Sequence, residues 1–417
     1  MTDSIYPLDG ETPSGAAVIV ERRRHPSIGI FIAADAHSQE VYDQNLQSIR
    51  CYAKRHNYDL ILIDSLNQTA IPTLQKRVLD LTVTRRAEST KHHSLSCASI
   101  SAFFFQRQCV ATQILPFYDF LVIFDADDAV ANADVTIESI LLRASRKTTD
   151  KNDVFKDPSS MKHYIPHVIH EQRFHTGEIM AGNMILQNTD FAQAYMKQWI
   201  DHYFTLPEPQ YAAPGKLVNK FYHKNVDNPS LSMVFLQTLA RIVAEGGGYG
   251  VGTSSSFNNA TLAAPHKSLI DNCHRLWKLS SGNQKYMNFI HCVEEATSQL
   301  AQDGKHVKDM EVMFPLYLYR RGHGGLGRDI QTCNGKVSPV DLIVHNLKGQ
   351  SNVIKHVSGF YSERPTCSDG VEVESWQAPV ATDRWKSLDE MKDLMKTPAC
   401  LAKATNVGDC WPHCIVT

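Results

Sequence analysis

The sequence predicts an α/β protein with a mostly parallel central sheet flanked by helices. Two segments, "IGIFIAAD" at 28–35 and "YDLILID" at 58–64, are apolar runs rich in β-branched residues, and the stretch between them is helical in its periodicity. A strand–helix–strand unit of this kind implies parallel strands joined by a right-handed crossover. Apolar runs without alternation are typical of strands that are buried on both faces.

The helix between these strands is predicted over 38–57. Tyr42, Leu46 and Ile49 recur on one helical face, and Ser38 is expected to start the first turn. The same signals predict further elements along the chain. They are a helix at 103–115, a strand at 118–128, a strand at 178–188, and helices at 190–204, 229–237 and 387–396.

Three stretches are predicted to lack regular structure. Residues 1–26 indicate a loose arm, 143–172 a long polar surface loop, and the Gly/Ser stretch at 245–259 a mobile connection. The domain organisation expected from these features is one α/β domain over 27–350, followed by an irregular C-terminal extension over 351–417.

Composition excludes several classes of protein. The chain has 417 residues, of which 43% are hydrophobic and 21% charged, and its net charge of −2 offers no basic surface for nucleic acid. The sequence contains no run of 18 apolar residues, so no membrane span is predicted. The N-terminus does not resemble a signal peptide, so the chain as it stands predicts a cytoplasmic protein. The Golgi lumen is the alternative if an N-terminal anchor has been removed.

The ten cysteines are scattered and contain no CxxC pair, so neither a disulfide scaffold nor a zinc site is predicted. Cys410 and Cys414 flank His413, which is a weak indication of a metal site or a disulfide. The sequons at Asn67 and Asn259 do not decide the compartment.

Three carboxylates stand at the end of one predicted strand. In "LVIFDADDAV" an apolar run leads directly into Asp125, Asp127 and Asp128. Clustered carboxylates beside a core are costly unless a cation compensates them. Ligands of open α/β sheets bind beyond the carboxyl ends of the strands. An Asp-x-Asp pair at such an end is suited to Mg²⁺ or Mn²⁺ that also holds a diphosphate.

An EF-hand, a phosphatase and a solvated turn are the other interpretations of these aspartates. An EF-hand is excluded, because Ala129, Val130 and Thr136 occupy positions where its loop needs an oxygen ligand, a glycine and a glutamate. A phosphatase of the haloacid dehalogenase type would use Asp125 as its nucleophile, but its Asp-x-Asp stands on the first strand of the fold. A solvated turn without a ligand remains the structural alternative.

The order of these elements, ending in a strand with Asp-x-Asp, is that of GT-A glycosyltransferases. The segment "FFFQRQCVATQILPFYDFLVIFDADDAVANAD" resembles the nematode-type nucleotide-diphospho-sugar transferases, a domain of unknown function. It is more distantly similar to the α-galactosyl-, mannosyl- and xyloglucan xylosyltransferase family. "EIMAGNMILQNTDFAQAYMKQW", "VDNPSLSMVFL", "YRRGHGGLGRDIQ" and "DLIVHNLKG" follow in the same order, so the resemblance covers about 27–350.

The resemblance implies a metal-dependent glycosyltransferase with a GT-A (Rossmann-like) fold. Its donor would be a UDP-sugar and its acceptor a hydroxyl of a carbohydrate or glycoprotein, with retention of the anomeric configuration favoured. Asp125, Asp127 and His345 would bind Mn²⁺ or Mg²⁺. Lys348 and the backbone of Gly349 would meet the diphosphate.

Three further residues take catalytic or donor-binding roles under the same resemblance. Arg107 would reach the donor sugar or its diphosphate, with a solvated helix charge as the alternative. Asp227 would lie near the transferred sugar or bind the acceptor hydroxyl, and it is also the expected N-cap of the following helix. Glu178 has a similar role, although Met180 replaces an asparagine of the xylosyltransferase type, so no sugar contact is expected from residue 180.

The remaining donor contacts are expected at the ends of two strands. The residues that would hold the nucleotide-sugar there are Ala33, Ala34, Asp35 and Ala126. A catalytically silent protein that binds a nucleotide-sugar is the alternative to an active transferase.

Overall fold

The computed structural model describes most of the chain, with gaps. The described residues are 26–63, 97–147, 165–173, 176–212, 215–245, 264–303, 312–313, 315–319, 326–329, 335–347, 360–367 and 373–395. The predicted arm therefore lies outside the described residues except for Pro26, and so does the predicted Gly/Ser stretch except for Glu245.

Strands and helices alternate through most of the described chain. The strands are β1 (Ile28–Ala33), β2 (Asp59–Ile63), β3 (Phe120–Phe124), β4 (Ala129–Val130), β5 (Val168–Gln172), β6 (Ile179–Gln187), β7 (Tyr211–Ala212), β8 (Lys216–Leu217), β9 (Val312–Met313), β10 (Leu316–Tyr319), β11 (Gly327–Asp329) and β12 (Ile343–His345). The α-helices are α1 (Ala36–Val41), α2 (Asp43–His56), α4 (Phe103–Ile114), α5 (Ile137–Lys147), α6 (Asp190–Thr205), α7 (Asn228–Ala244), α8 (Ala264–Lys278), α9 (Asn283–Asp303) and α10 (Leu388–Met395).

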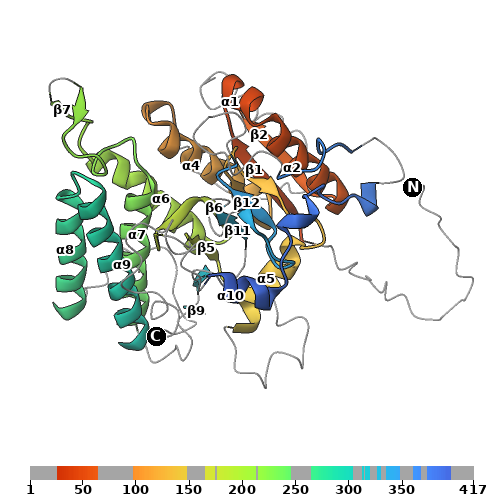
Figure 1. Cartoon of the computed structure of the whole chain (residues 1–417). Coiled ribbons are helices and arrows are strands. Elements are labelled where there is room, and N and C mark those ends of the chain that lie inside the picture. The colour runs from red at the N-terminus through yellow and green to blue at the C-terminus, as the bar shows by residue number, and fades with distance from the viewer. Residues whose placement is uncertain are drawn as a thin grey trace, which may run out of the picture.

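A seven-stranded sheet with the order β2-β1-β3-β6-β5-β10-β9 forms the centre of the molecule (Figure 1). β1 pairs in parallel with both β2 and β3, and β10 pairs in parallel with β5. β6 runs antiparallel between β3 and β5, and β9 is antiparallel at the edge. Most strands thus point in one direction, and the predicted α/β class with a mostly parallel sheet flanked by helices is confirmed.

The sheet is covered on both faces, which explains why its strands are apolar without alternation. Phe31, Leu121 and Ile123 face a core that includes α4, α6 and α7. Their neighbours Ile30 and Val122 face the opposite core, which includes α2 and α5. Because successive side chains of a strand point to opposite faces, every position of β1 and β3 is buried.

A smaller sheet brings the end of the described 335–347 segment to residues 125–128, the aspartate turn that follows β3. Its strand order is β11-β12-β4, and β12 runs antiparallel to β4, with Val344 opposite Ala129. Phe360 and Val380 of the C-terminal extension pack on the same strands. In addition, the hydroxyl of Tyr361 donates to the backbone oxygen of Val130 at 2.8 Å.

The helices α7, α8 and α9 form a layer of their own at one side of the sheet (Figure 1). Trp277 of α8 and Phe289 of α9 are fully buried and stacked, with ring centroids 5.9 Å apart. Neither α8 nor α9 was predicted from the sequence.

Two sequence predictions of local structure are wrong. The first helix is interrupted at Tyr42, and its cap is Asp35, whose side chain accepts from the backbone N–H of Ser38. The polar stretch 143–172 is not a surface loop throughout, since α5 continues to Lys147 and β5 is a buried strand inside the sheet. Residues 148–164 of that stretch lie outside the described residues.

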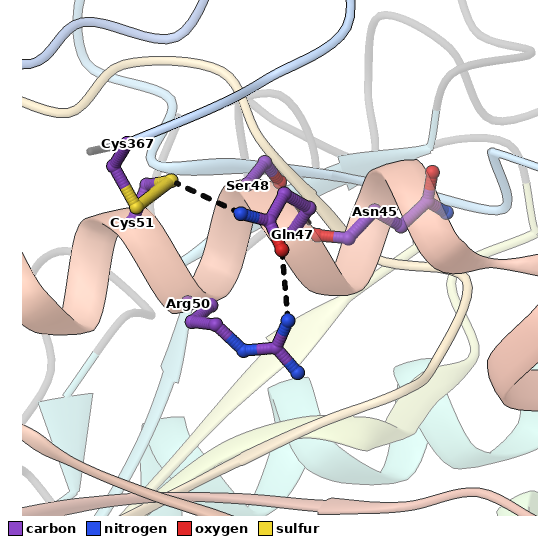
Figure 2. Close-up of a disulfide and its surroundings, with 6 residues drawn as sticks. All are labelled: Asn45, Gln47, Ser48, Arg50, Cys51 and Cys367. Atoms are coloured by element: carbon purple, nitrogen blue, oxygen red, sulfur yellow. Dashed lines mark hydrogen bonds between the residues drawn. A yellow bond between two sulfur atoms is a disulfide. The ribbon is translucent and has the colours of Figure 1, made fainter. Parts of the chain in front are cut away.

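Six cysteines form three disulfides, which corrects the expectation that no disulfide framework is present. The pairs are Cys51–Cys367, Cys97–Cys109 and Cys273–Cys292. Figure 2 shows the first pair, with Gln47 of the same helix donating to the sulfur of Cys51. This disulfide joins α2 to the C-terminal extension across 316 residues of sequence. The predicted role of Cys410, His413 and Cys414 lies outside the described residues.

We expect the Cys51–Cys367 disulfide to stabilise the fold more than the Cys97–Cys109 disulfide. The entropy that a cross-link removes from the unfolded chain grows with loop length, and the separations are 316 and 12 residues. The paired alanine variants should therefore differ by about 3 kcal/mol in free energy of unfolding. Urea denaturation of both double variants measures this difference, and equal losses would contradict the expectation.

Candidate metal centre

The turn after β3 is organised by Asp128. The backbone N–H of Asp125 donates to Oδ2 of Asp128 at 2.7 Å, and the N–H of Asp128 donates back to the carbonyl of Asp125 at 3.1 Å. Asp128 is fully buried, while the side chains of Asp125 and Asp127 remain 20% and 14% exposed. Only two of the three clustered carboxylates are therefore accessible to a ligand.

His345, at the end of β12, meets this turn from a distant part of the sequence. Its Nδ1 lies 3.8 Å from Oδ1 of Asp127 and 4.0 Å from Oδ2 of Asp125. Ligand atoms about 2.1 Å from one ion can be at most about 4.2 Å apart, so His345 can share an ion with each aspartate. All three residues offer ligand atoms within 4.8 Å of one another. Carboxylate oxygens suit both Mn²⁺ and Mg²⁺, whereas an imidazole is acceptable to Mn²⁺ and less so to Mg²⁺. The residue types therefore fit Mn²⁺ better than Mg²⁺, and their role as ligands stays a prediction.

Asp128 differs from the other two aspartates in its contacts, which the sequence pattern did not reveal. Its Oδ1 lies 2.8 Å from Nδ1 of His345, and the amide of Asn183, when oriented to donate, reaches its Oδ2 at 2.8 Å. Burial raises the pKa of Asp128 to about 7, against the influence of His345. Burial lowers the pKa of His345, but the carboxylates of Asp127 and Asp128 outweigh it and raise that pKa overall.

Gly182 on β6 leaves room for the carboxylate of Asp125. A Cβ at this position would lie 1.8 Å from Oδ2 of Asp125, so any side chain here would have to displace the carboxylate or the strand. The glycine in "AGN" is therefore explained by close approach rather than by backbone conformation.

Arg107 on α4 connects the aspartate turn to Asp227. Its guanidinium donates to Oδ1 of Asp125 and, at 3.1 Å, to Oδ2 of Asp227. Arg107 is 4% exposed, so the alternative of a solvated helix charge is wrong. Asp227 does stand at the N-cap position of α7, but its side chain makes no capping hydrogen bond and is directed to Arg107 instead.

A second arginine, Arg173, was missed because it directly follows β5, a strand inside the stretch that was predicted as a surface loop. Its Nη2 is 3.1 Å from Nε2 of His345, its Nε is 3.3 Å from Oε2 of Glu178, and its Nη1 is 3.6 Å from Oδ1 of Asp329. The hydroxyl of Tyr286 also donates to Glu178. Glu178 is thus linked to the metal centre through Arg173, and no local sequence pattern marks that arginine.

The other residues predicted to contact the donor lie at the ends of β1 and β3 or outside the described residues. Ala33 and Ala34 are buried at the end of β1, and Ala126 is half-buried in the core that faces α2 and α5. Asp35 caps α1, and the hydrogen bond from the Ser38 N–H lowers its pKa. Lys348 and Gly349 lie outside the described residues. The last described residue before them is Leu347, whose backbone N–H donates to the carbonyl of Asp127 at 2.9 Å.

Glu171, Arg328 and Asp341 form a second group of buried charged side chains. Glu171 on β5 accepts from the backbone N–H of Gly327, and Arg328 donates to both carboxylate oxygens of Asp341 at 2.8 and 3.0 Å. Burial raises the pKa of Glu171 to about 8, although Gly327 and Arg328 oppose the shift.

We expect Glu171 to make the fold less stable as the pH rises from about 4.5 to about 8. Below this window Glu171 is protonated in both states; within it the unfolded chain loses a proton that the folded chain keeps. The free energy of unfolding then falls by up to about 1.4 kcal/mol per pH unit. Urea denaturation at pH 5 and pH 8 should show a smaller fall for Glu171→Gln, and an unchanged fall for the exposed Glu295→Gln. Equal slopes in all three proteins would refute this.

The fold and this geometry define an α/β protein with a carboxylate–imidazole candidate metal centre at the end of a sheet strand. The chain is similar to a family described as "Protein of unknown function, DUF273", whose model matches residues 49–226. This span includes the aspartate turn and Glu178 but not His345. No curated protein matches the chain.

Among solved structures, the chain is similar to a glycosyltransferase involved in the glycosylation of the major capsid of PBCV-1. The two share 15% sequence identity with a TM-score of 0.24, over 42% of this chain and 66% of that chain. Within the described part of the chain, no helix combines the length and the apolar character that crossing a membrane requires.

Proposed function

We propose that this protein is a divalent-metal-dependent glycosyltransferase that moves a sugar from a UDP-sugar to a hydroxyl of a carbohydrate or glycoprotein. The observation that supports it best is the convergence of Asp125, Asp127 and His345 at the carboxyl end of β3. His345 and the turn are separated by 217 positions in the sequence, counted from Asp128. Beyond its contact with the buried Asp128, the imidazole of His345 lies within 4.0 Å of a carboxylate oxygen of both Asp127 and Asp125, which is close enough to share an ion with them.

In this proposal Asp125, Asp127 and His345 hold Mn²⁺ or Mg²⁺. When bound, the ion supplies the positive charge that stabilises the departing diphosphate. Asp227 and Glu178 are the carboxylates available to face the positive charge that develops on the sugar, or to bind the acceptor hydroxyl. Each is connected to the metal centre by one arginine, Arg107 for Asp227 and Arg173 for Glu178.

Lys348 is proposed to bind the diphosphate as a cation. We expect Lys348→Ala to weaken donor binding and transfer, because a charge-assisted hydrogen bond to phosphate is lost. The metal affinity should not change, since Lys348 carries no ligand atom for a cation. Calorimetric titration with UDP and, separately, with Mn²⁺ alone measures both effects, and a loss of Mn²⁺ affinity would contradict the assignment.

The experiment that tests the function is the release of free UDP. The protein is incubated with a panel of UDP-sugars and Mn²⁺, with a chelator as the matched control. Metal-dependent UDP release with one donor supports the transferase. Nucleotide binding without release from any donor would favour the catalytically silent protein. A phosphorylated Asp125 after incubation with phosphate esters would favour the phosphatase.

The three disulfides favour an oxidising compartment for this activity, and so the Golgi lumen over the cytoplasm. Protein from its native source should then carry a glycan on Asn67 or Asn259, detected by mass spectrometry before and after deglycosylation. Unmodified sequons together with reduced Cys51 and Cys367 would instead support the cytoplasmic location.

A further inference from the structure

We propose that the β7–β8 hairpin and the turn between α8 and α9 form a docking surface for a membrane that carries anionic lipids. None of its residues is a predicted metal ligand or catalytic residue, so the inference does not depend on the proposed function. The residues that define this docking surface are Tyr211, Lys216, Val218, Lys220, Lys278, Leu279 and Lys285.

The hairpin and the α8–α9 turn are held together by specific contacts. The ammonium of Lys220 donates to Oδ1 of Asn283, the first residue of α9, at 3.0 Å. The indole N–H of Trp277, near the end of α8, donates to the backbone oxygen of Phe221 at 2.7 Å. β7 projects from the body of the molecule beyond these helices (Figure 1). Two segments that are distant in the sequence therefore meet in one exposed region.

These two segments carry an excess of positive charge. Residues 206–226 and 275–289 contain one acidic residue, Glu208, against the basic residues Lys216, Lys220, Lys224, Arg275, Lys278 and Lys285. Glu208 pairs with Lys224 at 2.5 Å. The lysines of the docking surface form no ion pair with a carboxylate of the described residues. Because the whole chain has a net charge of −2, an attraction to an anionic surface has to come from such a local excess.

The same region carries most of the exposed large apolar side chains. Leu279, Tyr211 and Val218 are 51%, 63% and 44% exposed, and Phe204, at the end of α6 just before this loop, is 55% exposed. Within the described part of the chain, Phe104 is the one other large apolar side chain that is exposed. Apolar side chains among cations match the boundary between lipid headgroups and acyl chains.

The apolar side chains favour a lipid surface over a soluble polyanion. Lysines alone would suit a sulfated polysaccharide, but such a ligand offers no apolar medium for Val218 and Leu279. An aliphatic side chain gains free energy only when it leaves water for apolar surroundings. A bilayer with anionic headgroups supplies both the negative charge and the apolar medium.

Docking in this way would bring one side of the candidate site close to the membrane. Phe221 directly follows Lys220, and its ring stacks on that of Tyr286 with centroids 4.0 Å apart. The hydroxyl of Tyr286 in turn donates to Glu178. The docking surface is therefore connected to the side of the site on which Glu178 lies.

The test on the wild-type protein is sedimentation of the full chain with lipid vesicles, without metal or sugar donor. Binding to phosphatidylcholine vesicles that contain about 30% phosphatidylserine should be at least about tenfold stronger than to phosphatidylcholine alone, and should weaken as salt is added. Soluble phosphoserine should not release the protein. No binding, equal binding to both vesicles, or release by phosphoserine would overturn the proposal.

Variants locate the binding on this surface. Lys220→Gln/Lys278→Gln should weaken binding to the anionic vesicles about 20-fold, since each lysine near the membrane contributes about fivefold. Leu279→Gln should weaken it about tenfold through the loss of apolar insertion. The matched control is Lys197→Gln/Lys267→Gln, which removes the same charge from α6 and from the opposite end of α8 and should bind like the wild type.

Circular dichroism shows first that each variant is folded. Equal binding by the two double variants would overturn the proposal. Wild-type binding by Leu279→Gln would also overturn it, because a surface that binds through its lysines alone is one for soluble polyanions rather than for lipid.

Discussion

Asp127→Asn should abolish the metal-dependent release of UDP, with a fall of at least about 10³-fold in turnover. The amide keeps the shape of the carboxylate but loses the charge that holds the ion. The backbone carbonyl of Asp127, which accepts from Leu347, is unaffected, so the turn should stay intact. His345→Ala should have the same effect, through the loss of the imidazole ligand.

The matched control is Asp201→Asn, a change of the same kind at an exposed residue of α6 that pairs with Lys197. It should leave both turnover and Mn²⁺ affinity unchanged. Asp127→Asn that keeps the wild-type Mn²⁺ dependence would show that the aspartates only cap a turn. Thermal melting without metal should be nearly identical for the two variants, which separates ligand loss from unfolding.

The largest expected effect on stability comes from Arg107→Met. Arg107 compensates both Asp125 and Asp227, and its removal leaves two carboxylates in a largely buried site without their cation. Breaking a buried ion pair costs about 3–5 kcal/mol, and the lower end is expected here because Asp125 keeps partial contact with water. Urea denaturation in the presence of a chelator measures the loss.

The same variant should regain part of its stability when Mn²⁺ is added, since a bound cation takes over the compensation of Asp125. Arg275→Met, at an exposed residue of α8, serves as the control and should change the free energy of unfolding little. If Arg107→Met is as stable as the wild type, the buried pairing of Arg107 with the two aspartates is refuted.

The fold class and the approximate position of the site follow from local sequence patterns. The strands around Phe31 and Ile123 are continuous apolar runs because both faces of the sheet are covered, and such runs are visible without a structure. Asp125 and Asp127 directly after one of these runs indicate a charged site at a strand end. His345 was placed there only by the resemblance to a transferase family.

Tertiary structure decided the parts of the site whose partners are distant in sequence. β5 contains His170, Glu171 and Gln172, and a local pattern of polar residues predicts exposure. They are buried because their polar groups find partners on other elements, among them the hydroxyl of Tyr195 at 2.9 Å and the N–H of Gly327.

The same reason explains Asp128 and Arg173. Nothing in "DADD" tells which carboxylate turns inward, because the choice depends on the His345 ring that β12 brings to the turn by pairing with β4. Arg173 follows β5 directly, so its position beside His345 depends on a strand that the sequence did not reveal. A buried charge is stable only with its partners in place, and those partners are assembled by the sheet, not by neighbours along the chain.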